Sequence, residues 1–303
     1  MKDSAGTATA YLSGVKGRYG TLGVNAATVR RDCSTVAGNE VETVLEKAYK
    51  RGMSVGIVTT MYVTHASPGA AYAKTDNRGW YSDGSYIDYY GEEIPDNHKA
   101  CKDIATQLFE KSGNMTVIMG GGRRNFYPNE HEDGRKDGND FIASWKSQKD
   151  VKYVDNKNDL FAYANEGYVE DRLIGIFSEA HMEYDVDREE LAPTQPSLMN
   201  MTEIAIKKLS MNPNGYYLFV EGGKIDHGHH STRPIKALTD FKAFDNSIGK
   251  AKELVNLKET LVIVSADHSH TFTIGGYGRR GDSVFGVGTA DTEDDDENVF
   301  IRE

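Results

Sequence analysis

The sequence of 303 residues contains only two cysteines, fewer basic than acidic residues and no long apolar run. No stretch approaches the ~20 consecutive apolar residues of a transmembrane helix, so a membrane-spanning protein is not expected. The formal net charge of -11 disfavours a nucleic-acid backbone as partner, because both surfaces are negative. No secretory signal is visible, since Met1 and Lys2 run directly into Asp3 and Ser4. We therefore expect a cytosolic chain or an internal piece of a longer one.

The two cysteines, Cys33 and Cys101, leave two readings open. Neither has a Cys-x-x-Cys partner and neither lies near a histidine cluster, so both are poor metal ligands. They are either free thiols or a disulfide that closes a long loop, which would stabilise the fold by roughly 4 kcal/mol in an oxidising compartment. Two glycosylation triplets, which begin at Asn114 and Asn200, favour the same compartment.

The composition is that of an ordinary globular enzyme, with 38% apolar and 27% charged residues, and the length suits one large core. Apolar periodicity predicts four helices, and short β-branched runs predict four strands. The helices are expected at 39–51, 101–112, 197–210 and 235–254, and the strands at 54–60, 116–119, 216–220 and 260–266.

The alternation of helices with buried strands predicts an α/β fold with a largely parallel central sheet flanked by helices. The region 127–158 is polar and contains glycine, which is typical of a surface excursion, and only residues near 141–145 look helical there. No linker marks a boundary, so we expect a single domain over residues 1–303.

Residues 221–230 are the most unusual stretch, with two carboxylates and three imidazoles in ten residues. They follow the predicted strand 216–220, and neither a helix nor a strand needs this composition to fold. Carboxylates and neutral histidines are donors for Zn²⁺ and Mg²⁺, and the Gly-Gly pair at 222–223 frees the backbone. The alternative is a polar surface loop, which the density of donors disfavours.

Polar clusters follow three of the predicted strands. They occupy residues 64–67, 221–230 and 267–270, and they hold six of the nine histidines. Because ligands bind beyond the carboxyl ends of parallel strands, we expect the three clusters to converge. With so many donors, two metal ions ~4 Å apart could clamp the attacking and leaving oxygens of a phosphoryl transfer.

Spacing makes some of these donors more specific. Asp226 and His230 are four residues apart, which places them on one face of a helix. Asp267 and His268 are adjacent, which suits a turn around a metal. Two readings stay open for His65 and for His270. Each either supports a metal site from outside its ligands or is a packing histidine.

Asp3 and Ser4 begin a segment of small residues near the start of the chain. A serine hydroxyl among the free amides of a helix start is a natural anion site, although a plain N-capping pair explains these residues as well.

In combination these motifs resemble those of the alkaline phosphatase family, of the animal type, over essentially the whole chain. The resemblance is carried by residues 3–10, 65–68, 77–78, 221–230 and 266–270. It implies a three-layer α/β architecture with a mostly parallel sheet, and hydrolysis of small phosphate monoesters through a phosphoserine intermediate. It also implies two zinc ions and one magnesium ion as cofactors.

The resemblance assigns roles to single residues. Ser4 would be the nucleophile, Arg78 would grip two phosphate oxygens, and Asp3 would orient that arginine. These roles agree with the planar fork of a guanidinium and with a hydroxyl that a metal activates.

The same resemblance assigns the metal ligands and the cysteines. The first zinc would take Asp226 and His230, the second Asp267 and His268, and the magnesium Glu221 and Ser67. The supporting histidines would be His65, His227, His229 and His270. The resemblance also pairs Cys33 with Cys101 in a disulfide.

The chain departs from the family pattern in a few places. The family has an upstream Asp that bridges the second zinc and the magnesium, and a downstream His at the first zinc, and neither matches a residue here. Ser178 and Gln195 stand where the family has acidic calcium ligands, which disfavours calcium. We therefore expect an internal fragment of an alkaline phosphatase, incomplete at both ends.

Three functions remain to be compared. The first is a metal-dependent phosphomonoesterase, and the second is a truncated, catalytically impaired fragment that only binds metal or phosphate. The third is a sulfatase or phosphodiesterase, against which the Asp3-Ser4 motif and Arg78 argue. The resemblance further implies an extracellular or cell-surface homodimer in which Tyr277 reaches the partner's site, although no signal or anchor segment is recognisable in the chain.

Overall fold

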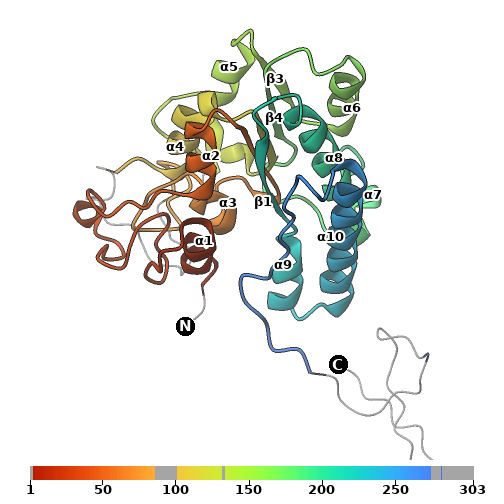
Figure 1. The fold of residues 1–303 in the computed structure, drawn as a ribbon. Coiled ribbons are helices and arrows are strands. Elements are labelled where there is room, and N and C mark those ends of the chain that lie inside the picture. The colour runs from red at the N-terminus through yellow and green to blue at the C-terminus, as the bar shows by residue number, and fades with distance from the viewer. Residues whose placement is uncertain (1–2, 86–100, 132–133, 274–280, 282–303) are drawn as a thin grey trace, which may run out of the picture.

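A parallel sheet of five strands forms the centre of the computed structural model, which describes residues 3–85, 101–131, 134–273 and 281 (Figure 1). The strand order is β3-β4-β2-β1-β5, and all four neighbouring pairs run parallel. The strands are β1 (Ser54–Tyr62), β2 (Val117–Gly121), β3 (Val151–Val154), β4 (Arg172–Ile176) and β5 (Tyr216–Glu221). The predicted α/β fold with a parallel sheet is confirmed.

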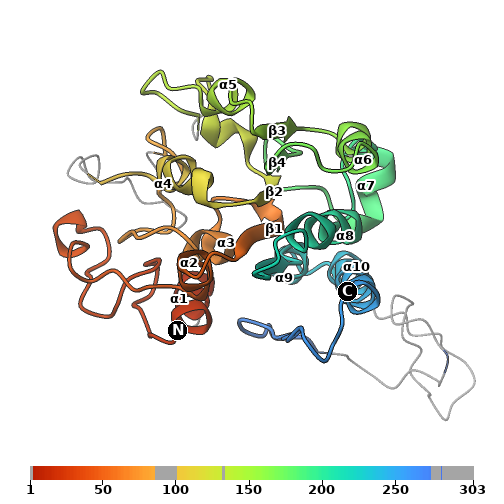
Figure 2. The same ribbon diagram turned by 45° about the horizontal axis from the view of Figure 1, so that its top comes forward.

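Helices cover both faces of the sheet, which gives three layers (Figure 2). Successive residues of β2 alternate between the two faces, as a pleated strand requires: Ile118 joins one apolar core, and Val117 and Met119 join the other. The first core is formed with α1 (Ser4–Ser13), α2 (Val44–Lys50), α3 (Ala66–Ala70), α4 (Ile104–Lys111) and α5 (Phe141–Lys146). The second is formed with α6 (Lys157–Asn165) and α8 (Leu198–Leu209), and α7 (Asp185–Leu191), α9 (Lys224–His230) and α10 (Pro234–Leu254) pack outside.

Short 3-10 helices connect several of these elements. They are η1 (Cys33–Thr35), η3 (Ser112–Asn114) and η4 (Arg123–Phe126).

Capping residues set the ends of the helices. Thr43 and Glu46 form a capping box, so α2 begins at Val44 and not at residue 39 as periodicity predicted. Gly52, with φ of 75°, ends this region in the left-handed conformation that glycine adopts without strain. The periodicity marked the helix, and the cap decided where it starts.

The region 127–158 is more regular than predicted. It contains α5, as expected, but it also contains β3, and the following β4 and α6 were not predicted. β3 is only four residues long and its two central residues are half-buried, so it has no apolar run that sequence reasoning could detect. Trp145 of α5 is fully buried and donates its indole N–H to Ser112 Oγ at 3.0 Å, so this region is part of the core.

The predicted strand at 260–266 is wrong. These residues form neither helix nor strand, and Leu261 and Ile263 are 84% and 78% exposed. A strand persists only when a neighbour accepts its backbone hydrogen bonds. In the part of the chain that the structure describes, β5 pairs with β1 alone, and residues 260–266 do not pair with the open edge of β5 or with another strand.

α9 and α10 approach each other very closely at Gly228. A Cβ atom on Gly228 would lie 2.6 Å from the backbone nitrogen of Ala237 in α10, closer than real Cβ atoms come. Glycine at this position therefore fixes the distance between the two helices and, with it, the place of α9.

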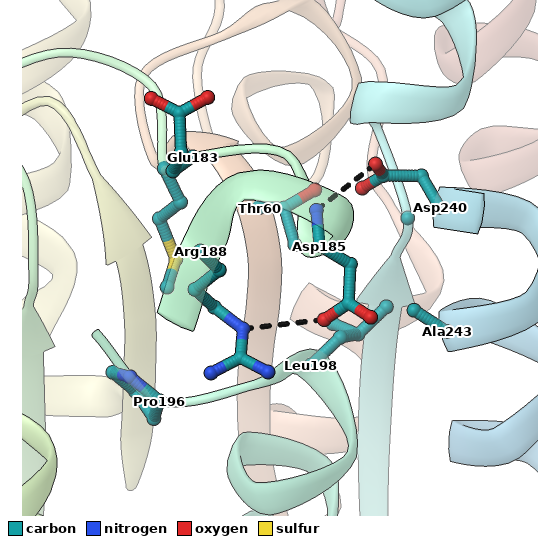
Figure 3. Close-up of a pocket in the computed structure, with 10 residues that line it drawn as sticks. Thr60, Glu183, Asp185, Arg188, Pro196, Leu198, Asp240 and Ala243 are labelled. Atoms are coloured by element: carbon teal, nitrogen blue, oxygen red, sulfur yellow. Dashed lines mark hydrogen bonds and ion pairs between the residues drawn. The ribbon is translucent and has the colours of Figure 1, made fainter. Parts of the chain in front are cut away.

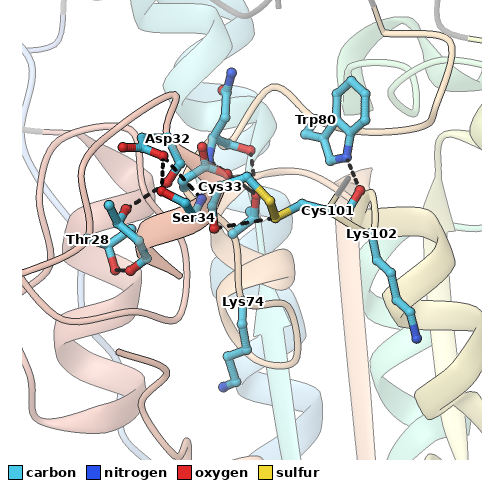
Figure 4. The surroundings of a disulfide bond; sticks show 12 residues. Thr28, Asp32, Cys33, Ser34, Lys74, Trp80, Cys101 and Lys102 are labelled. Atoms are coloured by element: carbon cyan, nitrogen blue, oxygen red, sulfur yellow. Dashed lines mark hydrogen bonds between the residues drawn. A yellow bond between two sulfur atoms is a disulfide. The ribbon is translucent and has the colours of Figure 1, made fainter. Parts of the chain in front are cut away.

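The predicted disulfide between Cys33 and Cys101 is present (Figure 4). Asp32 caps η1 by accepting a hydrogen bond from the Ser34 amide at 3.1 Å, and the buried Trp80 donates its indole N–H to the Cys101 carbonyl at 3.3 Å. The bond links positions 68 residues apart, a loop long enough for the cross-link to contribute about 4 kcal/mol of stability.

A small cavity of about 10 Å³ lies between β1, α7, α8 and α10 (Figure 3). Asp240 of α10 is buried at its wall, and its carboxylate accepts a hydrogen bond from the Asp185 amide at 3.1 Å. Burial raises the pKa of Asp240 to about 7 against the hydrogen bond from the Asp185 amide and the positive charge of Lys224. The negative charges of Asp185 and Glu183 add to the rise. The folded chain therefore holds a proton here that the unfolded chain has lost above about pH 4.

This proton makes folding stability fall as pH rises from about 4 to about 7. We expect Asp240→Asn, which keeps the hydrogen-bond acceptor, to flatten that decline by on the order of 2–4 kcal/mol. Urea unfolding across this pH range measures it. The control is Asp245→Asn on the same helix, at an exposed side chain. Equal slopes for Asp240→Asn and the wild type would contradict the assignment.

Candidate functional site

A buried ion pair joins the start of α1 to the loop after α3. Asp3 caps α1, and its carboxylate accepts hydrogen bonds from the amides of Gly6 at 3.2 Å and Gly20 at 2.7 Å. Its other oxygen pairs with Nη1 of Arg78, and both side chains are almost fully buried. Ser4, the first residue of α1, therefore follows directly on a carboxylate that caps the helix and holds a buried guanidinium. This is a geometry suited to an anion.

The Ser4 hydroxyl contacts a residue from the far end of the chain. Ser4 Oγ lies 3.1 Å from His268 Nε2, 264 positions away. The same nitrogen lies 3.5 Å from an Asp267 oxygen and 3.7 Å from Asp226 Oδ1. The cluster at 267–270 thus reaches the cluster at 221–230, although the strand that was expected to carry it there is not formed.

Asp226 Oδ1 is surrounded by imidazoles. His270 Nε2 lies 2.6 Å from this oxygen, and His230 Nε2 lies 3.5 Å from it. Asp226 and His230 sit one turn apart on α9, as their spacing predicted. Asp226, His230 and His270 each offer one donor atom within 4.8 Å of the others. His270, expected only as a supporting residue, is thus within reach of the same ion.

Glu221 ends β5 beside its neighbour Thr59 in β1, whose hydroxyl donates a hydrogen bond to Glu221 Oε2 at 2.6 Å. Burial raises the pKa of the Glu221 carboxyl to about 7, against hydrogen bonds from Thr59 and Ser67. The carboxylates of Asp267 and Asp226 raise it further. This crowding of negative charge, with oxygen and nitrogen donors around it, is what a divalent cation would neutralise, so the residues fit the metals expected from the sequence.

A second group of imidazoles lies nearby. His65 caps α3, His227 is on α9, and His181 comes five residues after β4. Burial lowers the pKa of all three, that of His227 to about 4. Sequence reasoning missed His181, because a lone histidine in a loop carries no spacing signal. Its position beyond the carboxyl end of a sheet strand is the one indication that could have found it.

The positions expected to disfavour calcium make local hydrogen bonds. The Ser178 hydroxyl donates to the His181 carbonyl at 3.0 Å, and Gln195 accepts from the Glu183 amide at 2.8 Å. Tyr277, assigned to a partner contact, lies outside the described residues. Within the described ranges, no helix combines the length and apolarity needed to cross a bilayer.

Comparisons with known proteins agree with the motifs. The family model described as alkaline phosphatase matches residues 1–302. An alkaline phosphatase of Gadus morhua is 46% identical over 303 residues, which cover 95% of this chain and 61% of that protein. The tissue-nonspecific isozyme of Rattus norvegicus is 46% identical over 304 residues, which cover 95% of this chain and 56% of that protein. The chain thus spans little more than half the length of these relatives.

Solved structures show the same fold. The crystal structure of the Thermus thermophilus alkaline phosphatase matches with a TM-score of 0.63 and 27% identity, over 82% of this chain and 44% of that chain.

The pairing of Asp3 with Arg78 predicts a large loss of stability when the carboxylate is neutralised. Asp3→Asn removes a carboxylate charge that pairs with a buried guanidinium, which we expect to lower the free energy of unfolding by about 3–5 kcal/mol. The matched control is Glu203→Gln, which breaks a surface pair with Lys207 and should change it by less than about 1 kcal/mol. Chemical denaturation of both variants measures the difference, and similar losses would refute a special role for the buried pair.

Proposed function

Since the chain belongs to the alkaline phosphatase family, we propose that it hydrolyses phosphate monoesters to an alcohol and phosphate through a phosphoserine at Ser4. Two observations support this proposal: Ser4 Oγ lies 3.1 Å from His268 Nε2, and Asp3, the residue before Ser4, forms a buried pair with Arg78. Because the chain spans little more than half the length of the relatives it matches, the reaction of the whole protein is a proposal.

Arg78 binds the substrate in this mechanism. Its planar guanidinium matches two phosphoryl oxygens, and the pair with Asp3 holds it in one orientation before substrate arrives. The amides at the start of α1 add donors for the same anion. Binding therefore places the phosphorus atom close to the Ser4 hydroxyl.

Ser4 performs the covalent step. Its oxygen attacks phosphorus, the bond from phosphorus to the alcohol oxygen breaks, and the alcohol leaves with a proton. Water then attacks the phosphoserine, which returns the Ser4 hydroxyl and releases phosphate. His268 Nε2 lies 3.1 Å from Ser4 Oγ, so the Ser4 hydroxyl loses its proton beside this imidazole when it attacks.

The donor sets have distinct places in this proposal. Asp226 and His230 would hold one zinc ion, Asp267 and His268 a second, and Glu221 with Ser67 a magnesium ion. When bound, these cations lower the pKa of an attacking oxygen and neutralise charge on the transferring group. The chain's own contribution is to keep Asp226, Asp267 and Glu221 close together although their charges repel.

Replacement of Ser4 tests the proposal. We expect Ser4→Ala to lower turnover of a chromogenic aryl phosphate by ~10³-fold or more with zinc and magnesium supplied, because no nucleophile remains. Ser13→Ala, at the other end of α1, is the matched control. Mass spectrometry after an acid quench should find one phosphoryl group on the wild type and none on Ser4→Ala.

Two results would overturn the assignment. If Ser4→Ala turns over at the wild-type rate, Ser4 is not the nucleophile. If the wild type binds metal and inorganic phosphate but neither turns over nor becomes phosphorylated, the chain is the impaired binding fragment. Faster hydrolysis of a phosphodiester or a sulfate ester than of the monoester would instead indicate a phosphodiesterase or a sulfatase.

We propose in addition that the protein is extracellular or on the cell surface, where the Cys33–Cys101 disulfide is stable. The homodimer and the single domain over residues 1–303 stay predictions.

The two glycosylation triplets differ in accessibility. Asn114 is exposed at the end of η3. Asn200 lies in the first turn of α8, where its amide oxygen accepts hydrogen bonds from the Ser197 amide at 3.2 Å and hydroxyl at 2.7 Å. The Thr202 hydroxyl is buried in the same helix and donates to the Leu198 carbonyl. A helical, engaged asparagine is a poor acceptor for a bulky sugar.

We therefore expect a secreted form to carry a glycan on Asn114 and none on Asn200. Intact mass before and after enzymatic removal of N-glycans should show a shift that Asn114→Gln abolishes. Asn200→Gln, the control, should leave the shift unchanged. A shift that survives in Asn114→Gln would contradict this prediction.

A further inference from the structure

We infer that His65, His181 and His227 form a metal site of their own, which takes a divalent transition-metal ion such as Zn²⁺. This group shares no residue with the set of Asp226, His230 and His270, and it is independent of the phosphoserine proposal. It goes beyond the metals proposed above, none of which uses these three imidazoles as ligands.

The geometry of the three rings supports the inference. Each offers one nitrogen, and the three nitrogens lie within 4.8 Å of one another. The ring centres are 4.7 Å apart for His181 and His227, 5.2 Å for His65 and His181, and 5.9 Å for His65 and His227. Nitrogens bound to one tetrahedral zinc lie ~3.3 Å apart. Displacements of about 1 Å, made by small side-chain rotations, would therefore bring the three nitrogens to the spacing that one ion requires.

The surrounding structure holds the rings near one another. They come from three separate elements, beyond β1, beyond β4 and on α9. Tyr62, at the end of β1, stacks on His181 with ring centres 3.9 Å apart. The His65 amide donates to the Tyr62 carbonyl at 2.9 Å. The group is thus assembled by the sheet and does not depend on a flexible loop alone.

The donor set decides which ion fits. Three imidazole nitrogens without a carboxylate suit Zn²⁺, Ni²⁺ or Cu²⁺, whereas Mg²⁺ and Ca²⁺ prefer oxygen. Three protein ligands also leave a fourth position for water or an anion. Arg78 lies near His65 and His227, so an anion in that position would offset the repulsion between the guanidinium and the bound cation.

One hydrogen bond must be exchanged when the ion binds. The Tyr62 amide donates to His181 Nδ1 at 3.1 Å, which leaves the ring proton on Nε2. A metal needs a bare nitrogen, so His181 must turn about its Cβ–Cγ bond or release the Tyr62 amide. The amide resonance of Tyr62 is therefore a reporter of this site that ligation at Asp226 or Asp267 does not move directly.

The test is a titration of the metal-stripped full chain with Co²⁺, whose visible absorption reports tetrahedral nitrogen ligation. His181→Phe keeps a ring to stack on Tyr62 but has no nitrogen, and His181→Asn keeps a polar acceptor if the Phe variant does not fold. The control is His131→Phe, at an exposed histidine outside the group. A second reference is Asp226→Asn, which removes a carboxylate from the group of Asp226, His230 and His270.

We expect the wild type and the His131→Phe variant to bind one more Co²⁺ per chain than the His181 variants, or to bind it at least tenfold more tightly. The Tyr62 amide resonance should move as this equivalent binds, and both signals should persist in Asp226→Asn. Equal stoichiometry and affinity in the wild type and both His181 variants would overturn the inference. So would an unmoved Tyr62 amide at saturation.

Discussion

The parallel pairing of β1 with β5 is the constraint on which the site depends. Its register runs from Ser54 opposite Tyr216 to Thr59 opposite Glu221, so both strands reach the same edge of the sheet together. The chain then leaves β1 toward α3 and leaves β5 toward α9, which brings His65 and Ser67 close to Asp226 and its neighbours. A shift of one residue would turn Thr59 away from Glu221 and separate the donor groups.

Around this edge the charges are unevenly distributed. Burial raises the pKa of Glu221, and the negative charges of Asp267 and Asp226 raise it further. Arg78 pairs with Asp3, and its positive charge also acts on His65 and His227. The folded chain holds this imbalance because two apolar cores stabilise the sheet and because α9 packs against α10. The stability that the two cores contribute thus maintains an electrostatic arrangement that is unfavourable by itself.

Much of the fold could be read from the sequence, because long amphipathic helices and buried β-branched runs have strong periodic signals. The ends of elements could not, since caps such as Thr43 decide them. The short β3 escaped because its half-buried residues show no apolar run. The strand at 260–266 failed for a different reason: its apolar sequence is suitable, but a strand also needs a neighbour, which local sequence does not specify.

The candidate site could likewise be predicted only in part from the sequence. The pairing of Asp226 with His230 followed from helical spacing. A shared place for Ser4 and His268 was implied by the family resemblance, because the strand predicted to carry His268 is not formed. His181 and the close contact of His270 with Asp226 depend on how separate loops come together. Such contacts are tertiary, and no window of neighbouring residues contains them.

Gly228 has a consequence for how this protein can vary. It lies between His227 and His229 and has no side chain that could act as a ligand. The absence of a side chain nevertheless sets the contact of α9 with Ala237. Any larger residue would push α9 outward and carry Asp226 and His230 with it. The range of residues that a position tolerates therefore depends on its packing. A glycine without any chemical role in the site can be as restricted in sequence as a metal ligand.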